Sequence, residues 1–286
     1  MSAAAPPATR QLGRARSLGA ASALAFALAI SVAGCALIRS HGAAAPVAES
    51  PAVANLTAAL AARDGSLHAM RSGAIMDFSS ADGRHFRTHE QVALMRPASI
   101  RVEALSPFGT TMLLAADGAR IQIFDPSKNT IMIGAANAAT LDRYVNIPLA
   151  PASAVDLLMG LAPAEITAAP NQSESNREGM TVLSSIGPGG ESRELGFVNG
   201  ELAMVREREA GGAIICQVRY SDYRMAGAIN FPHTVAAEFP SSKLTVRYDS
   251  PELNPALAAS LFVLTPGPAT REVTIGAAAI IHGSEG

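Results

Sequence analysis

Asp-Gly and Asn-Gly pairs divide much of this chain into short runs in which apolar and polar residues alternate. Pairs that separate such runs are Asp82-Gly83, Asp117-Gly118 and Asn199-Gly200. Such pairs supply the positive φ angles that a tight hairpin turn requires. Because a hairpin joins neighbouring antiparallel strands, the repeated signal predicts an antiparallel sheet, most simply a meander.

The segments beside these turns have the period of two that is typical of strands with one buried face. Between Ile100 and Ala104, for example, the apolar residues alternate with Arg101 and Glu103. We therefore expect mainly strands from about Ser66 onward. The clearest predicted strands are 110–116, 119–124, 179–186, 194–198, 201–206, 213–221, 234–239 and 243–249.

Only a few segments have helical spacing of their apolar residues. The expected helical segments are 55–62, 135–145, 151–161 and a turn at 255–260. After Pro266 no pattern indicates a strand partner, so 267–286 are expected to form a loose C-terminal tail. The predicted fold class is therefore mainly β with few helices.

The first 35 residues have the order of a secretory signal. Three arginines precede a short apolar run, which ends in Val32-Ala33-Gly34-Cys35 and is too short to span a membrane. A small-residue exit that ends on cysteine resembles the lipobox of bacterial lipoproteins. The resemblance implies a signal peptide at 1–34, cleavage before Cys35 and diacylation of that residue. The alternative is an ordinary signal peptide with an incidental cysteine.

The residues that follow suit a membrane-anchored domain. Residues 35–54 would be the lipidated N-terminus and a flexible tether, since they are rich in Ala, Pro and Ser. Residue 36 is not an aspartate, which by the same resemblance favours the outer membrane. Without the signal, the chain has 19 Lys and Arg against 24 Asp and Glu, a net charge of −5. That balance argues against nucleic acid as a partner.

A search for catalytic or metal-binding groups finds no convincing set. His85 and His89, followed by Glu90, have zinc-like spacing only on a helix, and here the segment is predicted to be a strand. We therefore expect these three residues to be solvent-facing polar positions. No nucleophile, base and orienting acid can be nominated together. Cys216 alternates onto the apolar face of a strand, which favours a buried, inert thiol. We therefore expect no enzyme activity, no metal site and no cofactor.

The apolar composition leaves the interior of the sheet open to two interpretations. The side chains are mostly Ala, Leu, Ile, Val and Met, with few aromatic residues and no tryptophan. Such side chains pack against flexible hydrocarbon as well as against one another. A curled sheet could hold either an ordinary core or a ligand cavity covered by the short helices, and composition alone favours the ordinary core.

A short loop between two predicted strands favours the cavity. In Ser106-Pro107-Phe108-Gly109, the proline fixes φ and the glycine permits a turn, so Phe108 is held at the tip. Either Phe108 folds back on the core, or it points outward. An outward apolar side chain is unfavourable unless it meets lipid or a protein partner.

The stretch from Ile100 to Leu161 resembles the LolB family of outer-membrane lipoprotein-localisation receptors. In that family a strand ends in an Asn-Pro-Leu-Gly loop whose projecting leucine is needed to deliver lipoproteins to the membrane. Here Phe108 takes the projecting position, with Ser106 in place of the asparagine. Residues 144–149 and 157–161 resemble the family's Pro-Leu segment and the helix after it. Residues 262–266 resemble the Phe-x-Leu-x-Pro ending of LolA-type carriers.

The resemblance implies a fold and a function. The fold is an unclosed antiparallel β half-barrel over 55–266, with short helices plugging a hydrophobic cavity. Pro107, Phe108 and Gly109 would form a membrane-insertion loop. The protein would accept acylated lipoproteins from a periplasmic LolA-like carrier and insert them into the outer membrane. The alternatives are a lipid or glycolipid carrier lipoprotein of the same fold, and a structural envelope lipoprotein without a ligand.

Overall fold

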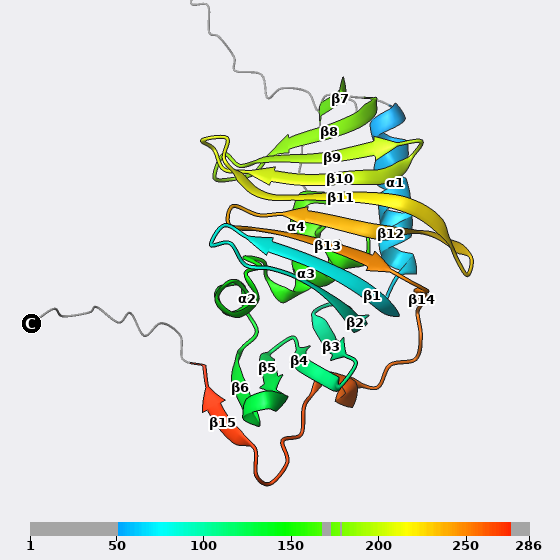
Figure 1. Ribbon diagram of the computed structural model, residues 1–286. Coiled ribbons are helices and arrows are strands. Elements are labelled where there is room, and N and C mark those ends of the chain that lie inside the picture. Colours follow the sequence, from blue (N-terminus) through cyan, green and yellow to red (C-terminus); the bar gives the residue numbers. More distant parts are fainter. Residues whose placement is uncertain (1–50, 168–172, 178, 276–286) are drawn as a thin grey trace, which may run out of the picture. The chain divides into compact units, whose positions relative to one another are not determined.

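The computed structural model describes residues 51–167, 173–177 and 179–275 (Figure 1). The predicted signal peptide, Cys35 and the tether up to residue 50 lie outside the described residues, as do residues 276–286 of the expected tail. Within the described ranges, no helix is both long and apolar enough to cross a bilayer.

The described residues form fifteen strands, which join in a single sheet. In chain order they are β1 Ala69–Ser80, β2 His85–Met95, β3 Ser99–Ser106, β4 Gly109–Asp117, β5 Arg120–Asp125, β6 Thr130–Ala135, β7 Ser173–Arg177, β8 Met180–Ile186, β9 Ser192–Val198, β10 Glu201–Arg208, β11 Ile214–Ala226, β12 Ile229–Glu238, β13 Ser242–Tyr248, β14 Glu252–Leu253 and β15 Arg271–Thr274.

The sheet consists of two antiparallel meanders, β1 to β6 and β7 to β13. The pairing of β1 with β13 joins them into one surface. β14 pairs with the start of β1, and β15 pairs with the edge strand β6. Because the outermost strands, β15 and β7, do not pair with each other, the sheet is not closed. The predicted fold class, a mainly β unclosed half-barrel, is confirmed.

The turn signals lie where the sequence predicts them. Gly83 and Gly118 have φ angles of 88° and 92°, and each lies in the turn that joins consecutive strands. At Asn199-Gly200 both residues have positive φ, 52° and 83°, as the commonest two-residue hairpin turn requires. The strands on either side of each turn pair as expected.

Four α-helices accompany the sheet: α1 Pro51–Ser66, α2 Ala138–Val145, α3 Pro151–Leu158 and α4 Ala164–Thr167. Figure 1 shows α1, α3 and α4 together on one face of the sheet, behind the strands of the second meander. The start of α2 is fixed by Asn137, whose side chain accepts a hydrogen bond from the backbone N–H of Thr140 at 2.9 Å.

Two predicted boundaries at the ends of the domain are wrong. The first helix begins at Pro51 rather than Asn55, since proline is well tolerated in a first helical turn and Val53 is buried beyond it. The boundary expected between tether and domain, at 54 and 55, therefore falls within α1. The helical turn expected at 255–260 is instead a 3-10 turn at Ala259–Phe262.

The expected loose tail is also wrong for its first part. Residues 271–274 form β15, which pairs in parallel with β6 in the register Arg271 to Thr130 through Thr274 to Ile133. A four-residue strand has too few residues for a periodic signal, and a parallel partner is not announced by a turn. The sequence pattern therefore offers no sign of it.

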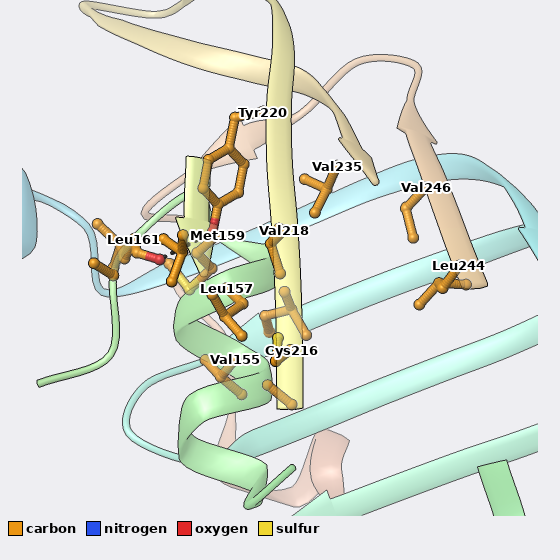
Figure 2. Close-up of a cluster of buried hydrophobic side chains, with 14 of the residues drawn as sticks. Val155, Leu157, Met159, Leu161, Cys216, Val218, Tyr220, Val235, Leu244 and Val246 are labelled. Atoms are coloured by element: carbon orange, nitrogen blue, oxygen red, sulfur yellow. Dashed lines mark hydrogen bonds between the residues drawn. The ribbon is translucent and has the colours of Figure 1, made fainter. Parts of the chain in front are cut away.

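A packed core lies between α3 and the strands β11 to β13 (Figure 2). Figure 2 shows the side chains of Val155 and Leu157 directed from the helix toward the strand that carries Cys216 and Val218. All four are at most 4 % exposed. At the end of the helix, the hydroxyl of Tyr220 donates a hydrogen bond to the carbonyl of Leu161 at 3.1 Å. Cys216 is buried here as predicted, and burial raises the pKa of its thiol to about 12.

Candidate functional site

Beside this packed core, the same face of the sheet is hollow. A cavity of about 260 Å³ lies over β1 to β4 and β13 and is covered by α2, α3 and the segment between them. Its walls are mostly Met, Phe, Leu, Ile and Val side chains. On each of β1 to β4 the lining residues have even numbers, because side chains alternate between the faces of a sheet. Examples are Met76 on β1, Val92 on β2 and Met112 on β4.

Two aromatic residues from the first hairpin also line the cavity. Phe78 on β1 faces Phe86 on β2, and their rings stack with centroids 4.8 Å apart. Phe78 is buried, whereas Phe86 is 42 % exposed. An aromatic side chain that is half in solvent and half in an apolar cavity marks an opening of the cavity toward the outside.

The cover of the cavity is held to the sheet by polar contacts at the end of α2. Asn146 ends this helix with a left-handed backbone, φ 56°. Its side-chain oxygen accepts a hydrogen bond from Arg84 at 3.0 Å, and its carbonyl accepts one from Ser242 at 2.6 Å. These bonds fix the helix over the strands without filling the space beneath it.

One wall residue is acidic. Glu90 is only 2 % exposed and lies on the cavity face of β2. One carboxyl oxygen accepts a hydrogen bond from the hydroxyl of Thr88 at 2.6 Å. Burial raises the pKa of Glu90 above its ordinary value, and that hydrogen bond only partly offsets the effect.

The sequence interpretation of Glu90 as a solvent-facing residue is therefore wrong, although His85 and His89 are exposed on a strand as predicted. The signal was present: Glu90, Val92 and Leu94 have the same parity on one strand, and the last two are buried. The nearest acidic contact to His85 is Asp77, at 3.1 Å. Within the described ranges, no cluster of three His, Cys, Asp or Glu side chains could hold a metal ion.

The loop singled out in the sequence connects β3 and β4. Phe108 is 99 % exposed, so it points away from the core. The loop is braced by Ser106, whose hydroxyl accepts from the backbone N–H of Phe108 at 3.2 Å and donates to the carbonyl of Gly109 at 2.9 Å. Gly109 has a φ of 116°, which a residue with a side chain rarely adopts.

The strand register relates this loop to the cavity. Leu105 at the end of β3 is paired with His89, so the loop beyond it projects at the end of the sheet where β1 turns into β2. Phe86, the exposed cavity residue, lies at that same end. Met112, four residues after Phe108, is the nearest cavity-lining residue along the chain. The exposed phenylalanine and the open side of the cavity therefore share one end of the sheet.

Comparison with known proteins gives matches in structure only. No protein-family model matches the sequence, and no curated protein matches it either. A DUF1329 family protein from Desulfovibrio piger superposes with a TM-score of 0.52 at 11 % identity, over 74 % of this chain and 96 % of that one. An outer membrane lipoprotein-sorting protein domain from Vibrio parahaemolyticus superposes with a TM-score of 0.50 at 10 % identity, over 73 % and 97 %.

A LolA superfamily protein from Nitrosomonas europaea has a TM-score of 0.49 at 11 % identity, over 73 % of this chain and 97 % of that one. The fold assignment rests on the first two proteins. The chain has the fold of a lipoprotein-sorting domain, and at these identities the likeness concerns the fold alone.

Proposed function

We propose that this protein is an outer-membrane lipoprotein, anchored through Cys35, which accepts acylated lipoproteins from a periplasmic LolA-like carrier and inserts them into the membrane. The observation that carries the proposal is the apolar cavity over β1 to β4, which opens at the end of the sheet where Phe108 is exposed. The lipoprotein-sorting domain with the same fold supports it.

The physical need for such a cavity follows from the cargo. An acyl chain of about 15 methylenes gains roughly 12 kcal/mol on leaving water, at about 0.8 kcal/mol for each methylene. Unaided transfer through the aqueous periplasm is therefore very slow. A cavity lined by Met, Leu, Ile and Val replaces water around the chain while no covalent bond is made or broken.

Phe108 would act at the release step. A fully exposed phenylalanine on a braced loop can enter the headgroup region of a bilayer, where its transfer from water is favourable. Its position at the open end of the cavity would bring the cargo close to the membrane. Direction can come from affinity alone, with the bilayer binding the acyl chains more tightly than the cavity does.

The test of this role is Phe108→Glu in a liposome delivery assay. We expect delivery to fall about tenfold or more, because the glutamate carries a charge that the bilayer interior excludes. Stability should change by less than about 0.5 kcal/mol, since Phe108 packs against nothing in the fold. Cargo binding in solution should be unchanged.

A matched control is Ile186→Glu. Ile186 is also a large exposed apolar residue, 64 % exposed, but it lies at the end of β8 in the other meander. This variant should deliver normally. Normal delivery by Phe108→Glu, or an equal loss in both variants, would remove the role that we assign to Phe108.

The cavity volume favours a second candidate, a carrier of free lipid or glycolipid. At about 260 Å³ the cavity is at the small end for a ligand pocket and suits one chain better than several. Mass spectrometry of gently purified protein separates the two: bound lipopeptide supports lipoprotein transfer, and bound free lipid supports the carrier. A protein without any bound amphiphile would favour a structural envelope lipoprotein.

A further inference from the structure

The cavity contains a polar atom that the fold leaves without a partner. Oε2 of Glu90 is buried and forms no hydrogen bond with any residue that the structure describes. The other oxygen, Oε1, is already occupied by the Thr88 hydroxyl at 2.6 Å. Asp156 provides the contrast: it is also buried, but its carboxylate accepts a hydrogen bond from Arg96 at 2.9 Å.

The neighbours of Glu90 leave space around this atom. In the register of the sheet, Glu90 lies between Ala74 on β1 and Ala104 on β3. The same row continues to Tyr248 on β13 and Met112 on β4. The large side chains of this row, Tyr248 and Met112, are therefore each separated from Glu90 by one strand that carries an alanine. A carboxyl group flanked by two methyl groups in an apolar cavity is accessible to a ligand but not to the protein's own donors.

The other titratable groups around Glu90 either bond to other residues or lie on another element or face. Arg84 donates to Asp82 at 2.8 Å and to Asn146 at 3.0 Å. The Tyr248 hydroxyl donates to the carbonyl of Leu158 at 2.9 Å. Tyr144 comes from the covering helix α2, and His89 lies on the opposite face of β2 from Glu90. None of these groups forms a hydrogen bond with Oε2 of Glu90.

An unpaired polar atom in an apolar cavity is unfavourable by itself. Such a group loses its hydrogen bonds to water and gains no partner in the protein. A ligand that supplies a donor recovers this loss, whereas a ligand without one leaves it in place. Sites of this kind discriminate strongly between analogues that differ in a single polar group.

We propose that Glu90 recognises the polar end of the cavity's ligand, and that this ligand is an acyl or alkyl chain that carries an N–H donor, either an ammonium or an amide group. The proposal rests on the proposed function, because it assumes that hydrocarbon fills the cavity. An N-acylated peptide and a free lipid amine both have this chemistry.

The raised pKa of Glu90 agrees with this assignment. The carboxyl group holds its proton to a higher pH than an ordinary glutamate does, because burial disfavours its charged form and the hydrogen bond from Thr88 only partly offsets this. An ammonium group beside it would favour the ionised form and form a charge-assisted hydrogen bond. An amide N–H can donate to the carboxyl group in either form.

The experiment compares three amphiphiles that have the same dodecyl chain: dodecylamine, N-dodecylacetamide and dodecyl methyl ether, which has no donor. Each displaces a fluorescent naphthalene probe from the full chain that carries Cys35→Ser, so that the chain's own acyl groups are absent. We expect the amine and the amide to bind about tenfold more tightly than the ether. Tighter binding of the amide points to an N-acylated peptide, and tighter binding of the amine to a free lipid amine.

Three variants locate this preference. Glu90→Leu should bind all three amphiphiles alike. Glu90→Gln should still prefer the amide to the ether but should bind the amine more weakly than the parent chain does, because the charge pairing with the ammonium group is lost. The matched control is Glu103→Gln, which removes the same charge from the other face of the neighbouring strand β3, where Glu103 pairs with Gln91. It should behave like the parent chain.

The outcomes separate this inference from the proposed function. Equal binding of the three amphiphiles by the parent chain, or a preference that survives in Glu90→Leu, overturns the role of Glu90 and leaves acyl-chain binding intact. Displacement by none of the three overturns both. If Glu90→Leu does not fold, as a melting curve would show, an unchanged affinity for dodecylamine in Glu90→Gln overturns the inference in its place.

Discussion

Over β11 and β12 the inner face of the sheet packs against α3 and the residues after it, and the side chains between them are almost fully buried. Over β13 and β1 to β4 the same face lines a cavity (Figures 1 and 2). Both regions are built from aliphatic and Met side chains, so apolar composition does not separate them. The difference comes from what covers each region.

In the packed region α3 and the residues just after it direct large side chains into the sheet. Val155, Leu157, Met159 and Leu161 are each at most 4 % exposed. In the hollow region the short helix α2 is held at its end by polar bonds to Arg84 and Ser242. One part of the sheet therefore provides the packing that stabilises the fold, and the adjoining part retains space for hydrocarbon.

The largest effect on stability is expected from a substitution in the packed region. Met159→Ala should lower the free energy of unfolding by about 2–5 kcal/mol, because Met159 is completely buried and its removal leaves a cavity. Met112→Ala, a matched change in the hollow region, should cost less than about 1.5 kcal/mol, because the Met112 side chain already borders empty space. Urea denaturation of both variants measures the difference. Equal losses would show that the two regions are packed alike.

A smaller effect is expected from two tyrosines that bind the same segment. The hydroxyls of Tyr220 and Tyr248 donate to the carbonyls of Leu161 and Leu158, respectively. Replacing either tyrosine by phenylalanine should destabilise the fold by about 1 kcal/mol, because a buried carbonyl loses its donor. Only Tyr248→Phe should also change the affinity for amphiphiles, by about two- to threefold, since Tyr248 lines the cavity.

Thermal melting and probe displacement, measured on the same preparations, check this pair. Tyr220→Phe is the control for Tyr248→Phe, because the two changes remove the same atom from opposite sides of the boundary between the regions. An affinity change of similar size in Tyr220→Phe would contradict the separation of the two regions.

The sequence predicted those structural features that are formed by residues close together in the chain. A hairpin turn and the alternation beside it involve neighbouring residues, so the β4–β5 and β9–β10 hairpins and the exposed tip at Phe108 could be located in advance. The two helices around 138–158 were also predicted, with an error of three residues at each outer end.

The remaining features depend on contacts between residues far apart in the sequence. The row that contains Glu90 exists because Ala74 on β1 lies opposite Tyr248 on β13, and no local pattern fixes that register. The pairing of β15 with β6 joins residues about 140 positions apart. Whether the inner face of the sheet is filled or hollow depends on where the helices lie, which hydrophobic periodicity does not specify.

The smallest effect is a pH dependence that belongs to the hollow region alone. Because the folded-state pKa of Glu90 is raised above its ordinary value of 4.5, the folded protein binds its proton more tightly than the unfolded chain does. Below about pH 4.5 the carboxyl group is neutral in both states, and its contribution to stability is fully present. As the pH rises toward the folded-state pKa, the unfolded chain ionises first, so stability falls and then levels off.

Glu90→Gln lacks this transition, so the difference in melting temperature between it and the parent chain should grow in favour of the variant from about pH 4.5 upward. Asp117 and Asp125 act in the opposite direction, since hydrogen bonds lower the pKa of each, that of Asp125 to about 2. They are unchanged in the variant and cancel in the difference. Melting curves that stay parallel across this range would mean that Glu90 is solvated or paired, and the hollow region would then contain no unpaired buried carboxyl group.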